Sequence, residues 1–494
     1  MNLKDWRIIM QDDIVIGLEI HVQLLTQTKL FCHCSTDYID REPNTNTCPV
    51  CLGLPGCLPV LNKKAVELAV RTAIALNCHI NTTNIFHRKN YFYPDLPKAY
   101  QISQYDLPLA GEGYLEILTG NQNEKVRIRI NRAHMEEDAG KLVHIEENGR
   151  ITGSLVDYNR SCIPLLEIVT EPDIHSSDEA IIFLQNLRSI VQYLGVCDGN
   201  LERGSMRCDA NISIRDSKTH QLGTKTEVKN MNSFRAIKKA LDYEIIRQRK
   251  MIEDGEKILQ ETRRWDEANN KTISMRTKEE AHDYRYFPEP DLLPLTIESS
   301  WIKEIEDNLP ELPADRKKRF VKDFGLSEYN ADRLVEVKSL GDYFEEAVGH
   351  YKNYEKLTNW ILSELLGYLS EDSIDISSSP VSAERLTELL VLIDRNIISG
   401  KIAKTIFEKM YKTGQRAEEL VQESGLTQIS DKSEIDTVIE KVISQNYQSV
   451  QDYHSGKEKA LNYLVGQVMR YTKGRAQPDL VLDLLKEKVN KLSN

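Results

Sequence analysis

Apolar and polar residues alternate along several short stretches in the first half of the chain. In residues 14–24 the even positions are apolar, whereas Glu19 and His21 share the opposite face. The same alternation recurs in residues 126–131, 207–215 and 225–229. Each stretch predicts a strand with one face on a core and a charged face that lines a polar groove.

The second half has apolar residues at helical spacing instead. Apolar residues after Ser382 recur every three or four positions, which predicts a helix that Ser382 caps and Gly400 ends. Further helices are predicted at 65–76, 314–322, 340–370, 402–412, 434–446 and 457–472.

The change of period near Pro294 predicts an α+β chain with three parts. The first, residues 1–295, is a largely antiparallel β-sheet cradle with helices. An all-helical domain over 296–425 follows, and a small helical tail domain over 426–494 ends the chain, with the loop at 425–431 as the second boundary.

The composition is that of a globular protein. The chain has 494 residues, 40% of them hydrophobic and 28% charged, which predicts two to four domains and excludes a disordered chain or a small disulfide-held fold. The first 13 residues contain no apolar signal region or Arg-rich transit pattern, and no stretch suits a membrane span. We expect a cytoplasmic protein, or a mature protein of an organelle matrix, with no membrane partner.

The net charge of −12 argues against a protein that coats nucleic acid without specificity. The last 41 residues differ, because they contain eight Lys and Arg but only four Asp and Glu. This basic tail suits local contact with a polyanion, and equally suits a solvated helix surface.

Four cysteines form the strongest metal-binding pattern. Cys32 and Cys34 are followed after thirteen residues by Cys48 and Cys51, and two close thiolate pairs can surround Zn²⁺ tetrahedrally. Four Cys ligands leave no position for water, so the predicted site is structural. The alternative is a set of four reduced cysteines.

A second cluster is rich in carboxylates. Glu19 and His21 combine with the run His134-Met135-Glu136-Glu137-Asp138 and with Glu167 and Glu171. Carboxylates with an imidazole predict a site for Mg²⁺ in phosphoryl transfer. For each residue taken singly, a solvated charge is the alternative.

Cations interleaved with aromatic residues form a third set, which predicts nucleotide or anion binding. No P-loop pattern occurs, so ATP would bind outside that architecture. The set comprises Arg88, Lys89, Tyr91, Tyr93, Lys98, Tyr100, Arg207, Lys225 and Lys229.

Eight stretches in order resemble the B-subunit family of the aspartyl/glutamyl-tRNA amidotransferases. They are GLEIHVQL (17–24), RKNYFYPDLPKAYQISQ (88–104), HMEEDAGK (134–141), YNRSCIPLLEIVTEPDI (158–174), GSMRCDANIS (204–213), TEVKNMNSF (226–234), ETRRWDE (261–267) and DYRYFPEPDLLPL (283–295). Residues 456–481 resemble the helical tail of that family.

The resemblance implies an ATP-dependent carbon–nitrogen ligase that is active as a heterotrimer with glutamine as amido donor. A chain of this family would phosphorylate the side-chain carboxylate of Glu-tRNA(Gln), Asp-tRNA(Asn) or both, and ammonia channelled from the partner amidase would displace the phosphate. A small third chain completes the heterotrimer, and the glutamyl- or aspartyl-tRNA synthetase is a further partner. The basic tail is then expected to contact the body of the tRNA.

Site residues follow from the same resemblance. Glu19, His21, Glu137 and Glu167 match metal-binding and catalytic positions, with Glu136 and Asp138 as neighbours that could share the task. Lys89 and Lys98 match the mouth of the ammonia channel, and together with Arg207, Lys225 and Lys229 they are the predicted ligand-binding cations. The four cysteines match the zinc-bearing members of the family.

A second function stays open: an adaptor that binds misacylated tRNA without catalysis. An adaptor needs cations, but it does not need acidic groups on the face of one groove, where they would repel phosphate. A metal-dependent hydrolase is disfavoured, because no general-base motif adjoins the carboxylates.

Overall fold

The computed structural model describes residues 13–120, 124–147, 150–216, 219–277, 281–424, 432–472, 475–476 and 478–491. The chain divides into two compact units, Met1–Pro313 and Ala314–Asn494. None of the described helices is long and apolar enough to cross a membrane.

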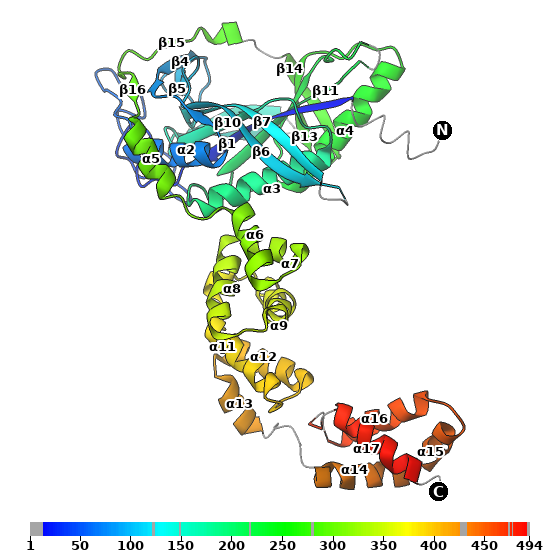
Figure 1. Cartoon of the computed structure of the whole chain (residues 1–494). Coiled ribbons are helices and arrows are strands. Elements are labelled where there is room, and N and C mark those ends of the chain that lie inside the picture. Colours follow the sequence, from blue (N-terminus) through cyan, green and yellow to red (C-terminus); the bar gives the residue numbers. More distant parts are fainter. Residues whose placement is uncertain are drawn as a thin grey trace. The chain divides into compact units, whose positions relative to one another are not determined.

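One large sheet forms the centre of the first unit (Figure 1). Its strands follow the order β14-β13-β12-β11-β1-β10-β7-β5-β4-β15, with β6 on β7 and β2 on β6. Neighbouring strands are antiparallel except β12 and β13. Two separate pairs are β16 with β3 and β8 with β9. The strands are β1 (Ile14–Gln23), β2 (His79–Ile80), β3 (Thr83–Asn84), β4 (Phe86–Asn90), β5 (Tyr100–Gln104), β6 (Ala110–Thr119), β7 (Glu124–Glu137), β8 (Lys141–Glu147), β9 (Arg150–Asp157), β10 (Pro164–Thr170), β11 (Met206–Ile214), β12 (Thr226–Lys229), β13 (Glu261–Asp266), β14 (Lys271–Thr277), β15 (Phe287–Pro288) and β16 (Leu295–Thr296).

Helices cover one face of this sheet, and the apolar side chains of the strands are buried beneath them. Ile16, Leu18 and Ile20 of β1 are completely buried in the same core as the inner faces of the helices. Asn62 and Ser176 cap α2 and α3 by accepting hydrogen bonds from the first turn. The helices of the first unit are α2 (Lys63–Ala75), α3 (Ser177–Tyr193), α4 (Phe234–Glu253), the 3₁₀ turn η1 (Ala281–Tyr284) and α5 (Ser299–Asp307).

Helices are the secondary-structure elements of the second unit in its described residues. Its buried apolar residues form two clusters, one from Phe320 to Val421 and one from Ile435 to Val489. The elements are α6 (Pro313–Phe324), α7 (Glu328–Val335), α8 (Lys338–His350), α9 (Tyr354–Asn359), the π-helical turn η2 (Trp360–Leu365), α10 (Leu366–Glu371), η3 (Ile376–Ser378), α11 (Ala383–Asp394), α12 (Gly400–Thr413), α13 (Ala417–Ser424), α14 (Lys432–Gln445), α15 (Tyr447–His454), α16 (Lys459–Tyr471) and α17 (Pro478–Lys491).

The predicted α+β class, with a largely antiparallel sheet followed by helices, is confirmed. The first unit extends to Pro313, past the boundary predicted at 295, and Ile305 of α5 belongs to the core of the sheet. The loop at 425–431, which carries the second predicted boundary, lies outside the described residues.

Two helix predictions are wrong in detail. The helix after Ser382 ends at Asp394, because Asn396 adopts a left-handed conformation with φ of 55°, and Gly400 begins the next helix. The single helix predicted over 340–370 is interrupted, because Tyr351 has an extended backbone that ends α8.

A buried carboxylate ties α4 to the edge of the sheet. The side chain of Glu244 is inaccessible to solvent and lies 2.8 Å from Arg247 Nη2 and 3.2 Å from Arg263 Nε. It also accepts a hydrogen bond from the Thr272 hydroxyl of β14. Because Arg263 and Thr272 come from different strands, this network holds β13 and β14 against the helix.

We therefore expect Glu244→Gln to lower the free energy of unfolding by about 3 kcal/mol, because it removes the counter-charge of the partly buried Arg247 and leaves Arg263 with Glu261 alone. Urea unfolding of the full chain, followed by circular dichroism, measures this change. Glu253→Gln, at an exposed position of the same helix, is the control and should shift stability by less than about 0.5 kcal/mol. Equal stability of the two variants would contradict the role of the network.

Candidate active site

The register of three central strands brings an imidazole and carboxylates together. His21 of β1 lies opposite Glu167 of β10, and Glu167 lies opposite His134 of β7. Since facing residues of neighbouring strands point to the same side of a sheet, these side chains share the face away from the helices. Glu136, two positions after His134, lies on that face as well.

The side chains meet within ligand distance of one another. His21 Nε2 is 3.4 Å from carboxylate oxygens of both Glu136 and Glu167, and His134 Nε2 is 3.2 Å from Glu167. One ligand atom each from His21, Glu136 and Glu167 lies within 4.8 Å of the others, an arrangement that can hold a metal ion. Both carboxylates are buried.

Burial and the charges of neighbouring groups together set the pKa values in this cluster. Burial lowers the pKa of His21, but the hydrogen bond and charge of Glu167 and the charge of Glu136 raise it to about 9. Burial and the neighbouring Glu167 raise the pKa of Glu136, whereas His134 and His21 hold the pKa of Glu167 well below its usual range despite its burial. A divalent cation would relieve the repulsion between the two carboxylates.

Glu137, a predicted metal ligand, lies on the other face of the sheet. Its carboxylate accepts a hydrogen bond from Ile102 N at 2.8 Å and pairs with the Lys98 ammonium. The cause is a β-bulge in β7: Ile130 and Arg132 pair with consecutive residues of β10, and Asn131 is the extra residue. The bulge reverses the alternation.

Before the bulge the even positions face the core, as at Ile128 and Ile130, and after it the odd ones do, as at Ala133 and Met135. Glu137 shares the side of Met135, and Glu136 shares the groove with His134. The structure thus groups Glu136, not Glu137, with His21 and Glu167.

Glu19 and Arg207 lie on the groove face beside the cluster. Glu19 accepts a hydrogen bond from Asn211 Nδ2 at 2.8 Å and is not among the side chains grouped at ligand distance in the described residues. Arg207 donates to Asp138 at 2.8 Å, and the Arg207 charge helps to lower the pKa of Asp138 although burial raises it. Lys229 pairs with Asp209.

Lys89 lies among aromatic rings near the carboxylates. Its ammonium is 4.9 Å from the ring centre of Tyr284 and 5.9 Å from that of Tyr91. Burial lowers the pKa of Lys89, but the charges of Tyr286 and Glu136 are among those that raise it overall. Lys89 therefore keeps its charge at the edge of the cluster.

The segment that supplies two of these tyrosines is held by Arg88. Its guanidinium donates to both oxygens of the buried Glu289 at 2.7 and 2.8 Å and to Asp291 at 3.2 Å. The guanidinium carbon also lies 4.4 Å from the ring centre of Tyr100. Arg88 therefore anchors residues 284–292.

A cavity of about 280 Å³ opens beside Glu19. Apolar residues such as Val169 and Leu222 line it together with Asn211 and Lys225. Lys225 is exposed and forms no ion pair with the described residues, so its charge is available to a ligand.

A second cavity, of about 180 Å³, is lined by Lys98, Ile102, Cys162 and residues of the cysteine loop. Gly53 of that loop approaches Lys98 so closely that a Cβ on the glycine would lie 2.1 Å from Lys98 Cγ. The cysteine loop thus packs against Lys98, the lysine that pairs with Glu137.

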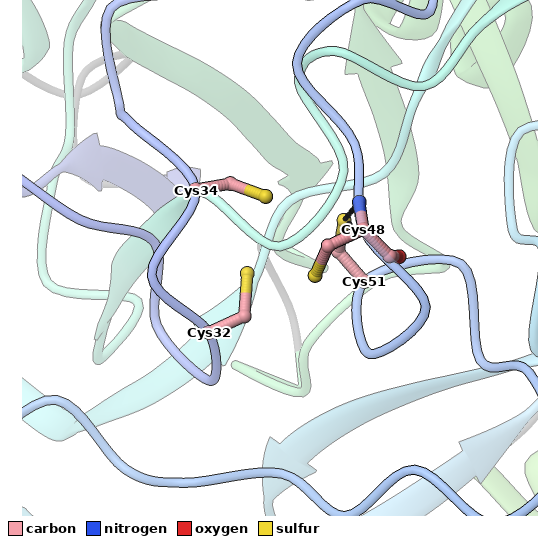
Figure 2. A group of neighbouring side chains, drawn as sticks. All are labelled: Cys32, Cys34, Cys48 and Cys51. Atoms are coloured by element: carbon pink, nitrogen blue, oxygen red, sulfur yellow. Dashed lines mark hydrogen bonds between the residues drawn. The ribbon is translucent and has the colours of Figure 1, made fainter.

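The four predicted zinc ligands lie together. One sulfur of each of Cys32, Cys34, Cys48 and Cys51 lies within 4.8 Å of the others, and Figure 2 shows the two pairs facing one another. Burial and the Cys48 thiol raise the pKa of Cys34 to about 11, and a bound metal ion would instead favour the thiolate. The donor set fits a structural zinc ion.

Several residues near the cluster of His21, Glu136 and Glu167 could not be predicted from the alternation of apolar and polar positions. Tyr286 lies about 150 residues from Glu136 in the chain and near it in the fold, and Tyr284 and the anchor Glu289 belong to the same segment. Only the resemblance of residues 283–295 to the family marks that segment in the sequence.

Arg88→Ala is expected to increase proteolytic cleavage within residues 284–292 at least fivefold and to lower activity, because Glu289 loses its counter-charge. Limited proteolysis with mass spectrometry measures the cleavage. Arg129→Ala is the control, because it removes a similar two-point pair with Asp173 at a more exposed position. If both variants resist protease like the wild type, Arg88 does not anchor the segment.

Comparisons with known proteins agree along the chain. Residues 14–303 match the family described as GatB/GatE catalytic domain, and residues 342–489 match the family described as GatB domain. The B subunit of the aspartyl/glutamyl-tRNA(Asn/Gln) amidotransferase of Carboxydothermus hydrogenoformans is 54% identical, over 97% of this chain and 99% of that protein. The corresponding proteins of Thermodesulfovibrio yellowstonii and Caldanaerobacter subterraneus are 54% and 52% identical over 96% and 98% of this chain, and over 99% and 100% of their own lengths. The polar groove thus lies in a chain that belongs to the B-subunit family of the aspartyl/glutamyl-tRNA(Asn/Gln) amidotransferases.

Proposed function

We propose that this chain, as the B subunit of a glutamine-dependent Asp/Glu-tRNA(Asn/Gln) amidotransferase, activates the side-chain carboxylate of the misacylated tRNA with ATP. The observation that carries the proposal is the convergence of His21, Glu136 and Glu167 in the polar groove of the sheet. The identity to other members of the B-subunit family over nearly the whole chain supports the same activity.

Mg²⁺ is the ion that we propose for this cluster. Mg²⁺ prefers oxygen ligands and keeps several waters, so two carboxylates and an imidazole leave room for phosphate oxygens of a nucleotide. Glu136 and Glu167 would supply the oxygen ligands and His21 would complete the set. Glu19 lies two residues from His21 on the same face of β1, beside the proposed ion. Bound there, the ion would neutralise phosphate charge during transfer.

We place ATP in the cavity beside Glu19. Its apolar lining at Val169 and Leu222 suits the base, and the exposed charge of Lys225 suits phosphate. Along β10 the chain leads from this cavity to Glu167 within two residues. The terminal phosphate can therefore reach the cluster while the base stays in the cavity.

The proposed reaction has two transfers. A side-chain carboxylate oxygen of the aminoacyl-tRNA attacks the γ-phosphorus of ATP, the bond to the bridging oxygen breaks, and ADP leaves. Ammonia then attacks the carbonyl carbon of the acyl phosphate, inorganic phosphate leaves, and the amide remains. Lys89 and Arg207, which keep their positive charge beside the groove, would neutralise the phosphoryl oxygens.

Ammonia is proposed to arrive from the side of Lys98 and Glu137. This pair lies on the face of the sheet opposite the metal cluster, beside the cavity that Lys98, Cys162 and Gly53 line. A polar pair in a small cavity can pass a neutral, hydrogen-bonding molecule, and Glu137 is the last residue of β7, where a path around the strand end is short. Glu137 is therefore proposed to act on ammonia rather than on the metal.

The partners follow from the same assignment. We propose a heterotrimer of this chain with an amidase and a small third chain, which takes misacylated tRNA as substrate and has a tRNA synthetase as a further partner. The tail domain is proposed to contact the tRNA body through its basic surface, and the enzyme is proposed to work in the cytoplasm. The adaptor hypothesis is disfavoured, because buried acidic groups converge where an adaptor would need cations.

Substitutions in the reconstituted heterotrimer can distinguish the roles of the three carboxylates. Glu167→Gln and Glu136→Gln are expected to lower tRNA-dependent ADP release at least 100-fold while tRNA binding and glutamine hydrolysis persist, because both remove metal ligands. Glu137→Gln is expected to lower amide formation more than ADP release. Assays of ADP, glutamate and amidated tRNA measure each step.

Glu116→Gln, at an exposed position of β6, is the control and should behave as wild type. Normal ADP release by the Glu167 and Glu136 variants would exclude the metal assignment and favour the adaptor. If Glu137→Gln lowers ADP release and amide formation equally, Glu137 acts in the activation step instead.

Lys225→Ala is expected to raise the KM for ATP about tenfold, because the variant removes an exposed cation from the proposed nucleotide cavity. The kcat at saturating ATP should change little, since Lys225 lies outside the metal cluster. Initial rates of ADP release across ATP concentrations measure both constants. An unchanged KM for ATP would show that the nucleotide binds elsewhere on the groove.

A further inference from the structure

Lys29 is a completely buried lysine between the two cysteine pairs. Its side chain is among the largest that are inaccessible to solvent in the first unit. The Lys29 backbone N–H donates to Cys34 O at 2.9 Å, on the first pair. The ammonium donates to Asn46 O at 2.8 Å and lies 3.9 Å from Cys51 Sγ, on the second pair.

A buried ammonium requires a counter-charge, because an isolated charge away from water is strongly unfavourable. In the part of the chain that the structure describes, the Lys29 ammonium contacts Asn46 O and Cys51 Sγ and forms no ion pair with a carboxylate. Its hydrogen-bond acceptor, the Asn46 carbonyl, is neutral. The sulfur cluster is the group in contact with Lys29 that can carry negative charge.

Four thiolates around one Zn²⁺ carry a net charge of about −2, which matches a neighbouring ammonium. The backbone of the loop is also arranged to donate toward sulfur, since Cys48 N–H donates to Cys51 Sγ at 3.1 Å (Figure 2). Groups that surround metal ligands orient them and stabilise their charged form. Lys29 has both the position and the charge for this task.

We propose that Lys29 is a positioning residue of the zinc site, where its buried positive charge stabilises the tetrathiolate and slows the loss of the metal. The inference rests on the proposed binding of zinc by the four cysteines and is independent of the amidotransferase chemistry. The hydrogen bond from the Lys29 ammonium to Asn46 O holds the ammonium beside Cys51, so the charge acts at a defined sulfur.

Zinc release from the heterotrimer tests this role. The enzyme is prepared in medium with zinc, the metal is counted by mass spectrometry, and its transfer to a coloured chelator is followed over time. Lys29→Met keeps the length of the side chain and removes the charge, and it is expected to release zinc roughly 10- to 100-fold faster. Lys29→Arg retains the charge and is expected to release zinc within about threefold of the wild-type rate.

Leu30→Met is the control for packing, because Leu30 is equally buried and uncharged. It is expected to release zinc at the wild-type rate. If Lys29→Met does not fold, Lys29→Gln, which retains a hydrogen-bond donor without the charge, replaces it and should show the same acceleration.

Wild-type release rates in the uncharged variants would overturn the role of Lys29, as would equal acceleration in Leu30→Met. A wild-type enzyme without zinc would overturn the inference together with the zinc site. Glu167→Gln should retain zinc at the wild-type level, so a failure of the proposed activity is distinguishable from a failure of this proposal.

Discussion

The alternation of side chains along antiparallel strands is the constraint on which the site depends. One face of the sheet is fixed by burial under helices, since the apolar residues of β1 have no other place away from water. Every polar residue of the opposite parity is then forced onto the groove. The antiparallel register of β1, β10 and β7 converts this sorting into contact between side chains that are far apart in the chain, such as His21 and Glu167.

Ion pairs determine which of the charged side chains in the groove are already engaged by other residues. Several cations near the groove are engaged by the protein: Arg207 with Asp138, Lys229 with Asp209 and Arg88 with Glu289. Carboxylates at the centre repel one another, whereas Lys225 at the cavity has no ion partner among the described residues. This imbalance separates a place for a metal cation from a place for an anion within one groove.

Much of this arrangement could be predicted from the sequence. The alternation in residues 14–24 predicts β1 and the shared face of Glu19 and His21, and the spacing of the four cysteines predicts their cluster. The side of Glu137 was not predicted, because the bulge at Asn131 becomes clear only in the pairing of β7 with β10. The sequence does carry a trace of it, since apolar residues fall on even positions up to Ile130 and on odd positions from Ala133. The engagement of Arg88 likewise depends on Glu289, which is distant in sequence.

The contact of Gly53 with Lys98 links two parts of the chain that have different chemistry. Since any side chain at Gly53 would overlap with Lys98, and Gly53 also has a left-handed φ of 66°, this position accepts no ordinary replacement while Lys98 is present. The two residues should therefore change together during evolution. The loop that carries the cysteines therefore also sets the position of the lysine that pairs with Glu137, so any change in the shape of the loop would shift that ion pair.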